Sequence, residues 1–437
     1  MGVGLMAIDH LKMKNMNKFI IWVAILFICQ PVWAEEKLTW TDCLRQASQY
    51  HPDLISAKEN IRQSLDAKII TASPLWPQAD TSLSLTQLKS QPSATGIKEN
   101  STTYAYGVSG SQLLFDGFKT INDVKASAEN VKASQWGFQF VSSQVRLRLR
   151  TAFINLLKGQ ELIKLTKDIY DIRKQSLNLI LKYYNSGIEH KGALMTAQAN
   201  LAEAEFEIHQ AQRGLEVAQR DLLKEIGART IEPVQAEGSL GITVNYQQTP
   251  DFEALVKNNP QLLQLMAQIN AVSFNVKSDQ SNFWPAVSLE GGVGKSDSHW
   301  PPGVADTNVG LKLTWPLLEG GTRVAQLDQA KSVLRGLQAQ EQSLKDTLVL
   351  ALEQNWFNLQ DAIEQVNVQK EFLDADVERA KIAEQQYSVG LMTFDDWTII
   401  EDNLVSGKKT FLNTQANALL AEADWTEAQG RTIEYAN

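Results

Sequence analysis

Four short segments of the chain alternate between apolar and polar residues. The clearest of them carries Val309, Leu311, Leu313 and Trp315, separated by polar or small residues. The apolar members of the other three segments are Leu83 and Leu85, then Tyr104, Tyr106 and Val108, and then Val287, Leu289 and Val293. A period of two predicts β-strands. Polar stretches rich in glycine, serine and proline, at about 90–102 and 296–306, separate the members of each pair, which predicts two hairpins.

Long segments with helical spacing surround these strands. From Gly117 to Gly187 and from Gly320 to Gly390 the chain runs for 70 positions without a proline. Apolar residues recur there at intervals of three, four and seven, as helix packing requires. At about 1.5 Å per residue, each helix would be on the order of 100 Å long. We expect a further helix of about 35 residues after each one, ending at Gly227 or Gly430. One continuous helix should precede each hairpin.

These elements occur twice in the same order. His51-Pro52 and Trp76-Pro77 match Asn259-Pro260 and Trp284-Pro285 at an offset of 208 residues. Beyond the hairpins the offset is 203 residues, as in LLFDG (113–117) and PLLEG (316–320), or YNSG (184–187) and YSVG (387–390). Two constant offsets predict an internal duplication. The first structural repeat is expected at 35–237 and the second at 238–437, with the preceding helices at about 41–71 and 251–280.

Residues 1–34 have the features of a signal peptide. Lysines at 12, 14 and 18 precede the apolar run 19–28, and Val32-Trp33-Ala34 resembles a cleavage site. The chain is therefore expected to be exported. Lipidation of Cys29 stays open, and the mature chain would keep Cys43 as a single thiol.

Composition excludes several classes of protein. A hydrophobic content of 43% argues against disorder, and no apolar stretch after residue 34 is long enough for a membrane helix. The net charge of −9 argues against a nucleic-acid partner. The five histidines are scattered and show no metal-ligand spacing, and no nucleophile–base pair is visible. We expect no catalytic residue, no metal and no cofactor, and thus no enzyme.

The predicted strands indicate a membrane barrel that one chain cannot close. Their apolar residues fall on one face and small polar residues on the other, which is typical of barrels in a membrane. Four strands leave open edges, which lipid does not tolerate. Two copies would give eight strands with a filled interior, whereas three would give twelve strands and a lumen. The alternative is a half-buried sheet in a periplasmic coiled-coil scaffold or receptor without a pore.

The duplicated Trp-Pro pairs, LFDG and LLEGG junctions, and YNSG and YSVG helix ends resemble the outer membrane efflux protein (TolC) family over residues 37–430. The resemblance implies a mainly α homotrimer with a β-barrel segment. Four strands per protomer would form a twelve-stranded barrel in outer-membrane lipid, continued by a long periplasmic α-helical barrel.

The same resemblance implies a function. Such a protein is a passive, gated exit duct of a tripartite efflux or type I secretion system. It docks to a periplasmic adaptor (membrane fusion) protein and is driven by an inner-membrane pump of the resistance-nodulation-division, ABC or major facilitator type. The cargo stays open among drugs, metal ions and polypeptides.

Two glycine turns should form the periplasmic tips. Gly187 with Ile188, and Gly390 with Ser388 and Leu391, lie where two antiparallel helices reverse, and glycine permits the left-handed backbone that this needs. By resemblance these turns contact the adaptor. A helix C-cap without further function is equally consistent with the pattern.

An acidic pair follows the second turn. Thr393 with Asp396 three residues later predicts a capped helix start. Alternatively, threefold symmetry would place Asp395 and Asp396 in a ring at the narrow end, favouring cations.

Three residues are candidates for a periplasmic gate: Asp395, Asp396 and Tyr387. By resemblance, Asp396 matches the first of two pore-constricting aspartates, and Ile399 stands where the second would be. Tyr387 matches a gate tyrosine, but Met392 replaces its arginine partner. Ala193 stands where an acid would complete the link, so the way in which the gate closes stays open.

Four aromatic residues flank the strands: Trp76, Phe115, Trp284 and Trp315. They are candidates for an interfacial girdle in the membrane. Core packing between the strands and the helices is the alternative.

Overall fold

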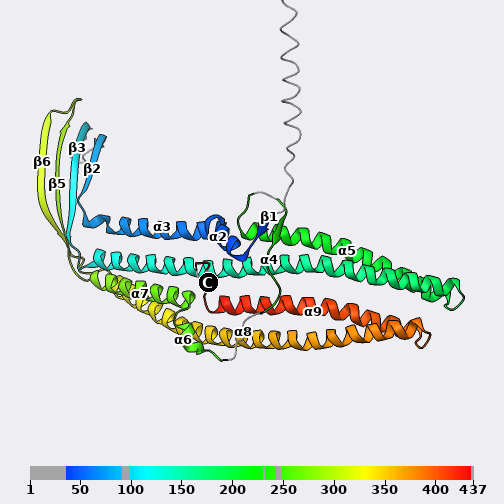
Figure 1. Ribbon diagram of the computed structural model, residues 1–437. Helices are drawn as coiled ribbons and strands as arrows, with labels where there is room; N and C mark the ends of the chain where they lie inside the picture. Colours follow the sequence, from blue (N-terminus) through cyan, green and yellow to red (C-terminus); the bar gives the residue numbers. More distant parts are fainter. Residues whose placement is uncertain (1–35, 91–98, 230–231, 243–247, 435–437) are drawn as a thin grey trace, which may run out of the picture.

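The computed structural model describes residues 36–90, 99–229, 232–242 and 248–434 (Figure 1). The chain is elongated, with a four-stranded sheet at one end and helical hairpins at the other. The predicted signal peptide and Cys29 lie outside the described residues.

Four long helices form most of the molecule. They are α4 (Lys119–Asn185), α5 (Lys191–Glu225), α8 (Thr322–Ser388) and α9 (Phe394–Ala428). The first and third have 67 residues and the other two have 35, so the predicted lengths are confirmed. The first and last residues of α4 and α8 differ by 203 positions, and so do those of α5 and α9. This is the offset seen in the sequence. Because α5 contacts α4, α4 contacts α9, and α9 contacts α8, the helices form a layer in the order α5–α4–α9–α8.

The expectation of one continuous helix before each hairpin is wrong. The chain forms two helices in each copy: α2 (Trp40–Tyr50) and α3 (Pro52–Ala72), then α6 (Phe252–Val256) and α7 (Pro260–Ser281). The residue before each proline, His51 or Asn259, has an extended backbone with ψ of 124° or 126°. Proline disfavours helix at the preceding residue but suits the first helical position. Each helix therefore ends and restarts at this point.

The predicted strands form one antiparallel sheet. They are β2 (Gln78–Ser90), β3 (Glu99–Phe115), β5 (Ala286–Asp297) and β6 (Val304–Thr314), in the order β2-β3-β5-β6. Both hairpins are confirmed, but the expected loops are too long because pairing continues into them. β3 already begins at Glu99, and β6 begins at Val304. The rest of the first loop, 91–98, lies outside the described residues.

Left-handed residues turn each hairpin into a long helix. Gly117 and Phe118 have φ of 69° and 68°, and Gly320 and Gly321 have φ of 60° and 86°. A Cβ on Gly117 would lie 2.7 Å from Cβ of Trp284. Glycine at this position is therefore required both by the backbone and by the close approach of the second repeat.

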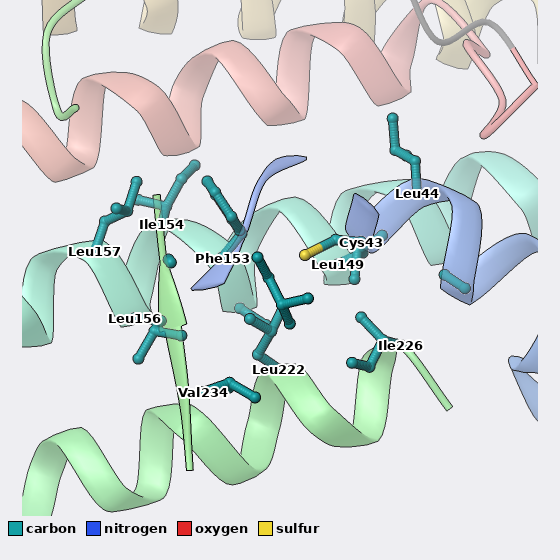
Figure 2. Packing of buried hydrophobic residues seen from close by; sticks show 14 of the residues in the cluster. Cys43, Leu44, Leu149, Phe153, Ile154, Leu156, Leu157, Leu222, Ile226 and Val234 are labelled. Carbon is teal, nitrogen blue, oxygen red and sulfur yellow. The ribbon is translucent and has the colours of Figure 1, made fainter. Parts of the chain in front are cut away.

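A small parallel sheet was not predicted. β1 (Glu36–Leu38) pairs with β4 (Val234–Ala236), and three-residue strands leave little periodic signal. The two strands contribute, with α2, α3, α4, α5 and α9, to the largest hydrophobic cluster among the described residues, which includes Cys43, Leu149 and Leu222 (Figure 2). Among the described residues, no helix combines the length and apolar character needed to cross a bilayer.

Candidate functional site

The strand register places the apolar and polar residues on opposite faces of the sheet. Leu83 lies opposite Tyr106, Val108 opposite Val293, and Leu289 opposite Leu311. Because paired residues share a face, all the apolar residues of the predicted alternation lie on one side. The opposite side carries mostly serine, glycine, asparagine, threonine and charged residues. Several of the apolar side chains are more than two-thirds exposed in the single chain. An apolar outer face and a polar inner face are the arrangement of a barrel wall in lipid.

Every layer of the molecule ends in open edges on the same two sides. In the sheet these edges are β2 and β6. The helices nearest the sheet contact one another in the order α3–α4–α7–α8, and the longer layer has the order α5–α4–α9–α8. One side of the chain therefore ends in β2, α3 and α5, and the other in β6 and α8. By the internal repeat, β6 and α8 are equivalent to β3 and α4. The opposite edge, β2, α3 and α5, is equivalent to β5, α7 and α9, which β3 and α4 contact inside the chain. Further copies can therefore extend all three layers at once.

The four girdle candidates lie at the end of the sheet nearest the helices. Trp76, Trp284 and Trp315 are 70%, 63% and 55% exposed, so they are not core residues of the single chain. Phe115 is half-buried and packs edge-on against Phe118. Their exposure agrees with a girdle, whose role in the membrane stays a prediction.

A second aromatic group, not predicted from the sequence, lies at the far end of the sheet. Trp300 in the β5–β6 connection packs against Tyr104 and Tyr106, with ring centroids 6.1 and 6.3 Å apart. The tyrosines belong to the strand alternation, but nothing in the sequence placed Trp300 beside them. The apolar face of the sheet is thus bordered by aromatic rings at both ends.

Both predicted turns end their helices with the same hydrogen bonds. Gly187 and Gly390 have φ of 73° and 76°. The amide of Ile188 donates to the carbonyl of Tyr183, and that of Leu391 to Gln386, at 2.9 Å each. This is the Schellman arrangement, which satisfies carbonyls at a helix end. Ile188 and Leu391 are 69% and 79% exposed at the tips, where they can contact another protein.

Tyr387 lies in a cluster at the tip that links the two repeats. Its ring is 3% exposed and stacks on Trp397, with centroids 4.5 Å apart and planes 9° apart. Its hydroxyl donates to Oε1 of Glu189 at 2.8 Å. Burial and the Glu189 carboxylate raise the pKa of the phenol well above its ordinary value, so this hydroxyl remains a donor. The ring of Tyr183 also packs on Tyr387, with centroids 5.6 Å apart. We call Tyr387, Glu189, Trp397 and Tyr183 the tip cluster.

The acid that accepts from Tyr387 is Glu189 rather than residue 193. Ala193 is buried, and its amide donates to Nδ1 of His190. Glu189 precedes this cap and lies against the end of α4, where its amide contacts the carbonyl of Tyr183 at 3.3 Å. Met392, in the place of the arginine, packs on the tip cluster. A family motif predicts the position of a side chain, whereas the turn geometry decides which acid reaches the tyrosine.

Asp395 and Asp396 do not join the tip cluster. Both are exposed in the first turn of α9. The amide of Asp396 donates to Oγ1 of Thr393 at 3.2 Å, and this hydroxyl donates to Oδ2 of Asp396 at 2.6 Å. These bonds are those of the capped helix start. They do not test the acidic ring, which needs other copies of the chain. Ile399 is also exposed, one turn further along.

A buried charged cluster, not predicted from the sequence, joins the repeats above the tip. Arg173 on α4 donates from Nη1 to Oε2 of Glu401 on α9 at 2.6 Å, and from Nη2 to Asp402. Ser176 donates to Oε1 of Glu401 at 2.5 Å. Arg173 and Glu401 are each 8% exposed, and burial raises the pKa of the Glu401 carboxyl. We call these four residues the Arg173 cluster.

The sequence held a signal for this cluster. Arg173 and Ser176 occur between Ile169 and Ile180 at helical spacing, within a buried stripe of α4. A charge there needs a partner, but that partner lies 228 residues away.

The described residues contain no group of three or more histidine, cysteine or acidic side chains that could hold a metal ion. Around the tip, hydroxyls and charges pair between the two repeats.

Comparison with known proteins agrees with this arrangement. The model of the outer membrane efflux protein family matches residues 43–228 and 253–431. Outer membrane efflux protein BepC of Brucella suis is 20% identical, with 90% of this chain and 85% of BepC covered. Outer membrane protein TolC of Escherichia coli is 22% identical, with 89% and 82% covered.

Among solved structures, the open-state outer membrane channel MtrE of Neisseria gonorrhoeae superposes with a TM-score of 0.77 at 17% identity. The match covers 89% of this chain and 88% of MtrE. The family model matches both repeats in full order, from the first helix to the glycine that follows the last. The chain belongs to the outer membrane efflux protein family.

Proposed function

We propose that the chain is the outer-membrane exit duct of a tripartite efflux or type I secretion system. The proposal rests on the open edges of all three layers, which lie on the same two sides of the chain. These edges are β2 and β6 in the sheet, α3 and α8 in the helices nearest the sheet, and α5 and α8 in the longer layer. A single chain would expose the edges of β2 and β6 to lipid, where unpaired backbone groups cost several kcal/mol each. Three copies supply twelve strands, which enclose a lumen. The α8 and α5 edges would close into a helical tube at the same time.

The dimensions support a duct that crosses the periplasm. At about 1.5 Å per residue, the 67-residue helices α4 and α8 are about 100 Å long. The apolar sheet face and the exposed aromatic residues at its ends support a barrel in outer-membrane lipid. The long helices would continue the polar lumen of the barrel across the periplasm toward the inner membrane. An inner-membrane pump, coupled through an adaptor, would supply the energy. The family is one of transport proteins, and we expect no catalysis by this chain.

The tip cluster is proposed as the closing element of the duct. The bond between Tyr387 and Glu189 links α8 of the second repeat to the turn of the first repeat, at the narrow end of the tube. Breaking it would free the second turn to move outward. Asp395 and Asp396 lie just beyond, where three copies would form an acidic ring that favours cations.

The exposed tip turns are proposed as the adaptor contact. The connections α4–α5 and α8–α9 lie at the end of the molecule away from the sheet (Figure 1). Gly187 and Ile188 belong to the first of these turns, and Ser388, Gly390 and Leu391 to the second. Apolar side chains on an otherwise polar tip favour a protein partner. The pump could be of the resistance-nodulation-division, ABC or major facilitator type.

The test of the duct combines extraction, assembly and conductance. We expect the mature chain to need detergent, to migrate as a heat-resistant trimer, and to conduct ions in planar bilayers. A monomer that stays in aqueous buffer without conductance would instead support the periplasmic scaffold.

For the adaptor contact, Leu391→Glu should reduce cross-linking to a co-expressed adaptor, with Leu391→Ala as the control. Undiminished cross-linking of both variants would rule out this turn as the docking point.

A further inference from the structure

The apolar face of the sheet carries a lysine beside the aromatic group at its far end. Trp300, in the connection between β5 and β6, packs against Tyr104 and Tyr106. Tyr106 is the register partner of Lys295, so the lysine lies on the same face as these rings. Lys295 is exposed and has no ion pair within the part of the chain that the structure describes. Because β5 lies between β3 and β6, further copies added at the edges of the sheet leave this group uncovered.

The position of Lys295 along its strand matches the edge of a hydrocarbon layer. Lys295 comes nine positions after Ala286, the first residue of β5. At about 3.4 Å per residue these positions span about 30 Å of strand, and a tilt of about 40° leaves about 23 Å along the membrane normal. The apolar band of membrane barrels is about 25 Å tall. Because the helices leave the sheet at its other end (Figure 1), Lys295 lies at the level of the outer-leaflet head groups.

The cations that follow the sheet at its other end are paired with acids. Nζ of Lys119 lies 3.8 Å from Oδ2 of Asp123, and Nε of Arg323 donates to Oε2 of Glu319 at 2.6 Å. Lys295 has no such acid among the described residues. Its methylene stem can lie along the apolar wall while the ammonium reaches the head groups. The difference places a free positive charge at the end of the sheet that faces the outer leaflet.

The neighbours of Lys295 leave room for a ligand and hold the aromatic group in place. Its register partner on β6 is Ala305, a small residue that covers little of the sheet beside the ammonium. Asp297 lies on the same face, opposite Tyr104. Both of its carboxylate oxygens accept backbone amides of the β5–β6 connection, at 2.6 and 3.4 Å. The carboxylate therefore holds the connection that carries Trp300.

We propose that Lys295, Trp300, Tyr104 and Tyr106 bind a phosphorylated glycolipid of the outer leaflet. The ammonium of Lys295 pairs with a phosphate of the head group. The rings of Trp300 and Tyr106, which are 60% and 41% exposed, pack against a sugar ring. Tryptophan and tyrosine suit this level because each has an apolar body and a polar group that hydrogen-bonds. The inference rests on the function proposed above, since the site requires a barrel in the outer membrane.

The test measures the lipid bound by detergent-solubilised trimers of the mature chain, by titration in native mass spectrometry. The probes are lipid A, dephosphorylated lipid A and phosphatidylglycerol, each with and without excess inorganic phosphate. The variants are Lys295→Ala and Trp300→Ala, with Trp300→Phe to restore a ring. Lys312→Ala is the matched control, because it removes a lysine of the inner face that pairs with Glu290 at 3.2 Å.

We expect the parent and Lys312→Ala to bind lipid A more tightly than the other two lipids. Lys295→Ala should lower the affinity for lipid A about fivefold, toward that for the dephosphorylated form. Trp300→Ala should weaken binding of both forms, and Trp300→Phe should restore it. Equal affinity of Lys295→Ala and Lys312→Ala for lipid A would overturn the site, and unchanged binding by Trp300→Ala would overturn the role of the rings.

The other probes decide which ligand the site takes. Equal binding of phosphatidylglycerol and lipid A by the parent would show that the sugar is not recognised and would overturn the glycolipid. Displacement of lipid A by inorganic phosphate would assign the site to a free anion. Conductance of the same trimers separates the site from the duct. Conducting trimers that bind no lipid A would overturn the site alone, whereas monomers without conductance in aqueous buffer would overturn both.

Discussion

Replacing Arg173 by alanine is expected to destabilise the helical part of the protein by about 3–5 kcal/mol. The substitution removes the guanidinium that donates to Glu401 and Asp402. Glu401, 8% exposed, would keep a carboxylate in a buried site with Ser176 as its remaining donor. The expected loss is much larger than for a surface ion pair, because the remaining charge cannot reach water.

The assay is thermal unfolding of detergent-solubilised trimers, followed by helical circular dichroism. At about 2.1 cal/mol/K per residue, unfolding of the 403 residues after the predicted signal peptide (437 − 34) has an entropy of about 0.85 kcal/mol/K. A loss of about 3–5 kcal/mol then lowers the midpoint by about 3–6 °C. The matched control is Lys164→Ala on the same helix, which removes an exposed pair with Glu161. It should cost under about 0.5 kcal/mol.

The loss should also depend on pH. Burial raises the pKa of Glu401 above its ordinary value, and removal of Arg173 raises it further. Stability due to protonation of this carboxyl is present below about pH 4.5 and is lost as the pH rises through the raised native pKa. The difference between Arg173→Ala and the parent should therefore shrink from pH 8 toward pH 5. Equal shifts for Arg173→Ala and Lys164→Ala, with no pH dependence, would refute the reasoning.

Three further predictions concern the tip. Tyr387→Phe removes the hydrogen bond to Glu189, so at about 1 kcal/mol per bond the open state should gain roughly fivefold per protomer in single-channel records; an unchanged open fraction would contradict the closing role. Asp396→Asn keeps an acceptor for the helix cap but removes the charge, and should lower cation preference in reversal-potential measurements; unchanged selectivity would leave Asp396 as a cap residue only. Gly390→Ala forces a Cβ onto a residue with φ of 76° and should cost roughly 1–2 kcal/mol in thermal unfolding. Gly336→Ala, inside α8 and with open space around it, should instead stabilise by about 0.5–1 kcal/mol, and equal effects would argue against the left-handed turn.

Short-range patterns determined the elements and their order. The alternation in 309–315 and its counterparts predicted the four strands, because side chains of a strand alternate between two faces whatever the partner strand is. Two features predicted the long helices: proline is absent from their interior, and a glycine stands at each end. The helices begin and end at equivalent positions in the two repeats. The same local chemistry was misjudged at His51 and Asn259, where proline splits the expected helix in two.

Contacts between residues far apart in the chain were decided only by the tertiary structure. The acid that accepts from Tyr387 is Glu189, 198 positions away, and it depends on how the first turn folds rather than on a motif. Arg173 meets Glu401 because α4 and α9 lie side by side in the layer. Hydrophobic periodicity tells a helix which face to bury, but not which helix will cover that face.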